Sequence, residues 1–134
     1  MKVHIYINKQ QVLKLLSSNG FDNKFLFLLS WMKESYPCIA LIVKNEQKNI
    51  LSFALLHRVD YDEFSGHNNP YLLNYIYTYE KYRRSGVATL LLSKIKKSYQ
   101  TTTFAKCNES IDLFNKAGFK LKGVRNECLT MQFS

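Results

Sequence analysis

The chain has 134 residues, of which 46% are hydrophobic and 14% aromatic, so it can bury a core and is not globally disordered. It carries 19 Lys and Arg against 10 Asp and Glu, a formal charge of +9, which favours an anionic partner such as nucleic acid or a phosphorylated cofactor. No apolar run approaches the ~18 residues of a membrane span, and three cysteines without CxxC spacing suggest neither a disulfide framework nor a zinc site. We expect one cytoplasmic (intracellular) domain over residues 1–134, with no membrane contact.

The charge is unevenly distributed along the chain. Residues 81–125 contain eleven basic residues and only two acids, Glu109 and Asp112. Residues 60–63 hold three acids in four positions. An anion site is therefore expected in the C-terminal half, and a contact with a cation near residues 60–63; solvated surface is the alternative for both.

Hydrophobic periodicity predicts the secondary structure, because strands alternate in polarity and helices repeat apolar residues three or four apart. In chain order the expected elements are a strand at 3–8, helices at 10–18 and 21–35, strands at 38–43, 50–56 and 71–78, a helix at 87–97, a strand at 102–107, a helix at 110–117, and strands at 119–124 and 128–133. The run 71–78 (YLLNYIYT) is apolar at nearly every position, as expected of a central strand covered on both faces. This order predicts an α/β fold with a mixed sheet flanked by helices.

The segment Arg83-Arg84-Ser85-Gly86-Val87-Ala88 lies between the buried strand and an amphipathic helix. Gly86 allows a tight turn and a close approach of the backbone to a ligand. The unpaired N–H groups at the start of the following helix would point outward together and form a phosphate cradle. Arg83 and Arg84 would add charge-assisted contacts. The segment therefore favours a phosphorylated ligand, although an ordinary strand-to-helix turn is the alternative.

This segment also resembles a family signature. Arg83-x-x-Gly86-x-Ala88, directly after the run from Tyr75, looks like the Q/R-x-x-G-x-G/A acetyl-CoA motif of the GNAT N-acyltransferases. A second segment, Asn108-x-x-Ile111-x-Leu113-Phe114-x-Lys116-x-Gly118-Phe119, is similar to that family's N-x-x-A-x-x-L-Y-x-K-x-G-F pattern. The resemblance covers residues 71–119, whereas residues 1–70 match only in the order of elements. It implies the GNAT fold, with a mostly antiparallel sheet that splays between its central strands.

The resemblance also implies roles for particular residues. The backbone of Ile76, Tyr77 and Thr78 should bind the pantetheine arm of acetyl-CoA like an added strand. Asn108 should flank the thioester, with a helix N-cap as its structural alternative. The residues expected at the pyrophosphate, through backbone N–H groups or charge, are Arg83, Arg84, Ser85, Gly86, Val87, Ala88 and Thr89.

Two departures from the family pattern concern catalysis. The family's tyrosine, often the acid that protonates the leaving thiolate, is Phe114 here, so Phe114 would be an apolar wall beside the thioester. The family's frequent glutamate on the central strand has no counterpart in residues 71–79. Candidates that could accept a proton, through water, are His57, Tyr75, Tyr77 and Asp60, each with packing or a solvated loop as its alternative role. The three histidines have no ligand spacing, so no metal is expected.

Together these observations predict an acetyl-CoA-dependent N-acetyltransferase that acts on a primary amine in a ternary complex. The first alternative is an acyl-CoA-binding protein without transferase activity, motivated by Phe114 and the missing glutamate. The second is a small basic nucleic-acid-binding domain, motivated by the charge of +9. The acceptor amine, whether a small molecule, a peptide or a protein, is not specified by the sequence.

Overall fold

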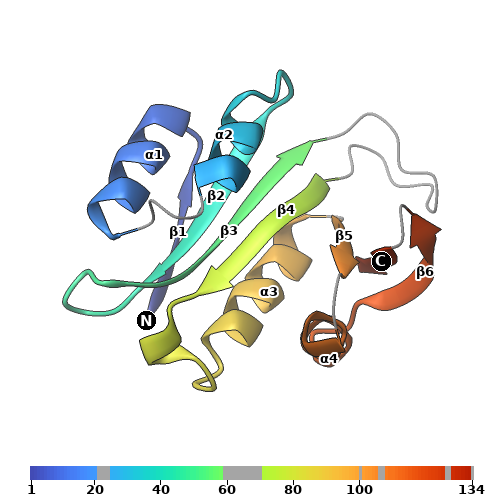
Figure 1. The fold of residues 1–134 in the computed structure, drawn as a ribbon. Coiled ribbons are helices and arrows are strands. Elements are labelled where there is room, and N and C mark those ends of the chain that lie inside the picture. The colour runs from blue at the N-terminus through green and yellow to red at the C-terminus, as the bar shows by residue number, and fades with distance from the viewer. Residues whose placement is uncertain (21–24, 59–70, 100, 106–107, 126–127, 134) are drawn as a thin grey trace.

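Seven strands form one mixed sheet in the computed structural model, which describes residues 1–20, 25–58, 71–99, 101–105, 108–125 and 128–133 (Figure 1). The strands are β1 (Lys2–Tyr6), β2 (Cys38–Lys44), β3 (Ile50–Arg58), β4 (Tyr71–Thr78), β5 (Thr101–Ala105), β6 (Lys120–Arg125) and β7 (Cys128–Phe133). They lie in the order β1-β2-β3-β4-β5-β7-β6. Every neighbouring pair is antiparallel except β4 and β5, which are parallel.

The helices are α1 (Lys9–Ser18), α2 (Phe25–Met32), α3 (Val87–Ser98) and α4 (Asn108–Lys116), and a short 3-10 helix, η2 (Glu80–Tyr82), follows β4. The helix α3 links β4 to β5, because parallel neighbouring strands need a crossover connection. α1 begins after Asn8, whose side chain accepts a hydrogen bond from the N–H of Gln11 at 3.0 Å, an N-cap of the usual kind.

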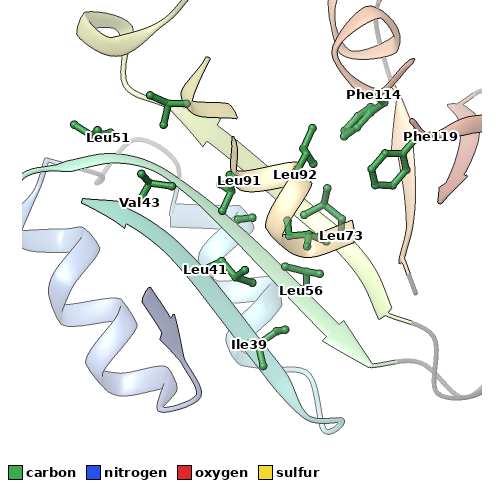
Figure 2. Packing of buried hydrophobic residues seen from close by; sticks show 13 residues of the cluster. Ile39, Leu41, Val43, Leu51, Leu56, Leu73, Leu91, Leu92, Phe114 and Phe119 are labelled. Carbon is green, nitrogen blue, oxygen red and sulfur yellow. The ribbon is translucent and has the colours of Figure 1, made fainter. Parts of the chain in front are cut away.

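Two apolar cores lie on opposite faces of the sheet. The core on the side of α1 and α2 includes Val12, Leu16, Leu28, Trp31, Ile42, Phe53 and Leu55. The core on the side of α3 includes Leu41, Leu56, Leu73, Val87, Leu91, Leu92 and Ile95, together with Phe114 of α4 and Phe119 (Figure 2). The indole N–H of Trp31 also donates to the carbonyl of Leu56 at 2.8 Å, which attaches α2 to β3.

The predicted elements are confirmed in type and order, and the differences are local. The second helix covers Phe25–Met32 rather than 21–35; it ends five residues before Pro37, and residues 21–24 lie outside the described part. The strand β4 is central, as predicted, but it is less covered than expected: of its eight residues only Leu73 is fully buried. None of the helices in the described ranges is long and apolar enough to cross a membrane.

The packing of α3 can be tested with two neighbouring leucines. Leu91 has no exposed surface, whereas Leu90 is 38% exposed. We expect Leu91→Ala to lower the free energy of unfolding by about 2–5 kcal/mol, because it leaves a cavity between α3 and the sheet. The matched control Leu90→Ala should cost less than about 1 kcal/mol. Urea unfolding followed by circular dichroism measures both values, and equal losses would contradict this packing.

Candidate functional site

The site is organised by a β-bulge at Asn74 in β4. Across from it, β3 pairs Leu56 with Leu73 and Leu55 with Tyr75, so Asn74 is an extra residue without a cross-strand partner. An extra residue bends its strand and increases the local twist. The three parallel residue pairs between β4 and β5 end at Leu73, immediately before the bulge. The bulge therefore marks the point where the two central strands part.

Beyond the bulge, one edge of β4 is open. In the described part of β5, Phe104 and Ala105 pair with β7 and not with β4. Among the described residues, the pairs between β4 and β5 thus do not include residues 75–78, whose β5-facing edge is called the seam below. Such an edge can accept an extended ligand as an added strand. The splay between the central strands, which the family resemblance implied, is therefore present (Figure 1).

The far end of the seam leads through η2 into a tight turn. Arg84 has φ of 63° and Gly86 φ of 82°, so both lie in the left-handed region, which non-glycine residues seldom adopt. The hydroxyl of Ser85 donates to the carbonyl of Tyr82. A Cβ added to Gly86 would meet no atom within 4 Å. Glycine is thus favoured here by its backbone conformation, and the space above the turn is open.

The helix α3 begins directly after this turn with an uncapped N-terminus. No side chain in the described ranges accepts a hydrogen bond at the Gly86 cap, and the first N–H groups of a helix have no intrahelical acceptor. They point outward at the positive end of the helix dipole, where anions bind. The exposed side chains of Arg83 and Arg84 flank this position. The turn therefore has the features of an anion site at the end of the seam.

Arg83 is less free than the sequence alone suggests. Its Nε donates to the carbonyl of Thr78 at 2.9 Å, and its guanidinium carbon lies 5.4 Å from the ring centroid of Tyr77. These contacts hold the side chain against the end of β4. Its remaining N–H groups are the part that would serve a phosphate.

Tyr75 and Tyr77 of β4, with Tyr79 just after the strand, pack against the core on the side of α1 and α2. The rings of Tyr75 and Tyr77 are stacked, with centroids 6.3 Å apart and planes 7° apart, while Tyr77 and Tyr79 meet edge-on at 5.3 Å. Burial raises the pKa of Tyr75; Tyr77 raises it further and Arg83 lowers it in part. Tyr75 is therefore a neutral phenol near pH 7, which donates a hydrogen bond or proton more readily than it accepts a proton.

His57 lies on β3 beside the bulge and is only 6% exposed. Its Nδ1 is 2.7 Å from Oδ1 of Asn74, and its Nε2 is 4.0 Å from Oε2 of Glu34. Both ring nitrogens thus face protein groups. A direct role of His57 as a base stays a prediction.

Two further predicted residues contribute their side chains to the core on the side of α3. Ile76 packs against the core on the side of α3. Phe114 belongs to the same core: it is 3% exposed, and its ring centroid is 5.4 Å from that of Phe119 (Figure 2). Helix α4 begins at Asn108, but the Asn108 side chain and Asp60 lie outside the described residues, so their roles stay predictions.

Asn74 and Glu34 were not among the residues predicted from the sequence. Asn74 is the only strongly polar side chain in the run YLLNYIYT, and a half-buried amide there needs a partner. Glu34 left no such signal, because its proximity to His57 arises only when α2 lies on the sheet. Among the described residues, no three His, Cys, Asp or Glu side chains gather as a metal ion would require.

No protein-family model matches the sequence, and no curated protein matches it. Solved structures do match. The aminoglycoside N-acetyltransferase AAC(6')-Iy in complex with CoA aligns with a TM-score of 0.65 and 15% identity over 92% of this chain and 95% of that chain. The aminoglycoside 6'-N-acetyltransferase AAC(6')-IG from Acinetobacter haemolyticus aligns with a TM-score of 0.63 and 16% identity, over 93% of this chain and 94% of that chain. The spermidine N-acetyltransferase from Vibrio cholerae, in complex with CoA and spermine, aligns with a TM-score of 0.61 and 10% identity, over 97% of this chain and 92% of that chain.

The chain therefore has the fold of the GNAT N-acetyltransferases, which confirms the fold class implied by the two sequence motifs. At these identities the likeness concerns the fold.

A hydrogen bond between Tyr79, just after β4, and Asn19, at the end of α1, can be tested through its pH dependence. The Tyr79 hydroxyl donates to the carbonyl of Asn19 at 3.0 Å, and burial, with Tyr77 contributing, raises the Tyr79 pKa to about 12. An unfolded tyrosine titrates near ~10, so stability is complete below that pH and decreases as the pH rises toward 12. We expect the wild type to lose more stability than Tyr79→Phe between about pH 9 and about pH 11. Urea midpoints across this range measure the difference; parallel pH profiles would contradict it.

Proposed function

We propose that this protein is an N-acetyltransferase that moves the acetyl group of acetyl-CoA to a primary amine within a ternary complex. The single observation that carries the proposal is the open seam of β4 ending at the Gly86 turn. An extended chain with an amide-rich arm at one end and phosphates at the other fits this arrangement. Acetyl-CoA has that form, and two solved structures of the same fold contain CoA.

In this proposal the pantetheine arm adds to the backbone of residues 76–78 as a short strand. The pyrophosphate lies against the N–H groups of residues 84–89, where the dipole of α3 stabilises negative charge. Arg84 and the free part of the Arg83 guanidinium supply charge-assisted hydrogen bonds. The thioester then lies at the opposite end of the seam, near the bulge at Asn74.

The reaction needs little more than placement of the two reactants. The amine nitrogen attacks the thioester carbonyl carbon, the C–N bond forms, the C–S bond breaks, and CoA leaves as its thiolate. Backbone N–H groups of the seam stabilise the oxyanion. A thiol with a pKa near ~8.5 leaves without protonation, and an amine with a pKa near ~8 releases its proton to water. A lysine acceptor near ~10.4 would need a base.

One alternative is supported by specific residues. Phe114 replaces a possible proton donor, and β4 carries no carboxylate, so the protein would bind acyl-CoA without transferring the acyl group. A CoA-release assay against a panel of amines and peptides, with acetyl-CoA thermal stabilisation as control, separates the two. Stabilisation with turnover supports the transferase, and stabilisation without turnover supports the binding protein. Stabilisation by polyanions in general would favour the nucleic-acid alternative.

The turn at Gly86 provides a matched pair of substitutions. We expect Gly86→Asp to abolish thermal stabilisation by acetyl-CoA, because the side chain places a negative charge where the pyrophosphate should lie. Gly20→Asp is the control: Gly20 also has a positive φ, of 76°, and open space around its Cβ position. Both variants therefore carry similar backbone strain. Differential scanning fluorimetry with and without acetyl-CoA gives the comparison, and equal stabilisation of both variants would refute the site.

Phe114 provides a test of the leaving-group step. Phe114→Tyr adds the hydroxyl that the family pattern has, in a side chain that is almost fully buried. An enzyme whose thiolate leaves unassisted should change less than about tenfold in kcat, whereas a well-placed acid contributes ~10²-fold or more. The buried hydroxyl should also cost about 1–3 kcal/mol of stability if it remains unpaired. A hundredfold gain in kcat would show that the native site lacks a needed proton donor.

A further inference from the structure

A chain of three polar side chains lies behind the bulge. Glu34, just after α2, faces Nε2 of His57 at 4.0 Å, and Nδ1 of His57 is 2.7 Å from Oδ1 of Asn74. His57 is buried beside apolar neighbours such as Cys38, its pairing partner in β2. A polar group buried in this way is costly unless it is hydrogen-bonded. The bond to Asn74 meets that requirement at the residue that forms the bulge.

The bulge reverses the alternation of side chains along β4. Leu73 packs in the core of the α3 side and Tyr75 in the core of the α1 and α2 side, although residues two apart in a regular strand share a face. Asn74 absorbs this change and has no pairing partner in β3. The apolar pattern on both sides makes a bulge necessary, but it does not fix the orientation of the peptide groups within it. The hydrogen bond of Asn74 to His57 supplies that constraint.

We propose that His57 is a positioning residue of the transferase: it holds Asn74, and Asn74 holds the bulge peptides in the orientation that the thioester requires. Glu34 orients the imidazole from its other side. This inference rests on the proposed function, because it concerns the acyl end of the same seam. His57 and Glu34 would therefore affect the reaction through Asn74, without contacting the substrate themselves.

The position of the bulge determines which kinetic step should respond. The seam runs from Tyr75 at the bulge to Thr78, and the anion turn lies beyond Thr78. A disordered bulge would therefore displace the thioester and leave the nucleotide end in place. A misplacement of about 1 Å can cost ~10²-fold in rate. The expected signature is a lower kcat with nearly unchanged affinity for CoA.

The test uses variants that keep one ring nitrogen position at a time. The amide of His57→Asn places an N–H donor near the Nδ1 position and can bond Asn74, whereas His57→Gln reaches toward the Nε2 position and Glu34. His57→Leu and Asn74→Ala remove the bond altogether. The measurements are kcat and KM for the best amine, the dissociation constant of CoA by calorimetry, and the thermal midpoint of every variant.

We expect kcat to fall about 10- to 100-fold in His57→Leu, His57→Gln and Asn74→Ala, with the CoA dissociation constant within about threefold of wild type. His57→Asn should recover kcat to within about fivefold of wild type, and the double variant His57→Leu/Asn74→Ala should lose no more than the worse single variant. The inference is overturned if His57→Leu or Asn74→Ala keeps kcat within about twofold of wild type, or if His57→Asn and His57→Gln have the same kcat. It is also overturned if the loss of kcat in the double variant equals the product of the two single losses. If His57→Leu does not fold, the kcat values of His57→Gln and Asn74→Ala provide the test.

A binding comparison separates this inference from the proposed function. If the wild type binds acetyl-CoA but transfers nothing to any amine, the transferase proposal fails. The bulge is then judged by the preference for acetyl-CoA over CoA, since only the acetyl end lies beside it. Loss of that preference in Asn74→Ala and His57→Leu, but not in His57→Asn, supports the bond as the determinant. An unchanged preference, or a wild type that binds neither ligand, contradicts it.

Discussion

A single extra residue in a central strand determines the architecture of the candidate site. Regular pairing would let β4 continue alongside β5 and satisfy the backbone of both strands. The extra residue Asn74 ends that pairing at Leu73 and leaves the edge of residues 75–78 open. An open edge within a sheet is normally a liability, because it can pair with another chain. Here it lies at the centre of the sheet, between strands that the two cores hold in place.

The other features of the site are arranged along this edge. At one end, the left-handed conformations of Arg84 and Gly86 turn the chain into α3 and present uncapped N–H groups to an anion. At the other end, the side chain of Asn74 is bonded to His57. A ligand with a phosphate group at one end and a reactive group at the other fits this polarity. The formal charge of +9 is consistent with such a ligand but does not select it.

The fold was predictable because its elements have strong local signals. The apolar run of β4, the amphipathic α3 and the Gly86 turn each follow from periodicity or backbone preference, and two motifs place them in one known scaffold. The departure of β4 from β5 was predictable only through that resemblance. From the residues alone, YLLNYIYT suggests a strand covered on both faces, since periodicity does not show where pairing ends.

The surroundings of Asn74 were less predictable from the sequence, for a physical reason. His57 and Asn74 come from β3 and β4 and Glu34 from the segment just after α2, and they meet only when α2 lies on the sheet. No local pattern encodes such a meeting. The burial of Phe114 beside Phe119 is of the same kind: the sequence marks Phe114 as a replacement for a tyrosine, but only packing shows that it is a core residue.

Hydrogen exchange measured by mass spectrometry can show whether acetyl-CoA binds along the seam, because it reports on backbone N–H groups. We expect saturating acetyl-CoA to slow exchange in residues 75–78 and 84–89, where the seam and the anion turn lie, while β1 and β2 exchange as before. CoA alone should protect the turn as strongly and the residues next to the bulge less. Unchanged exchange in both segments under saturating acetyl-CoA, or protection elsewhere in the chain only, would contradict the account.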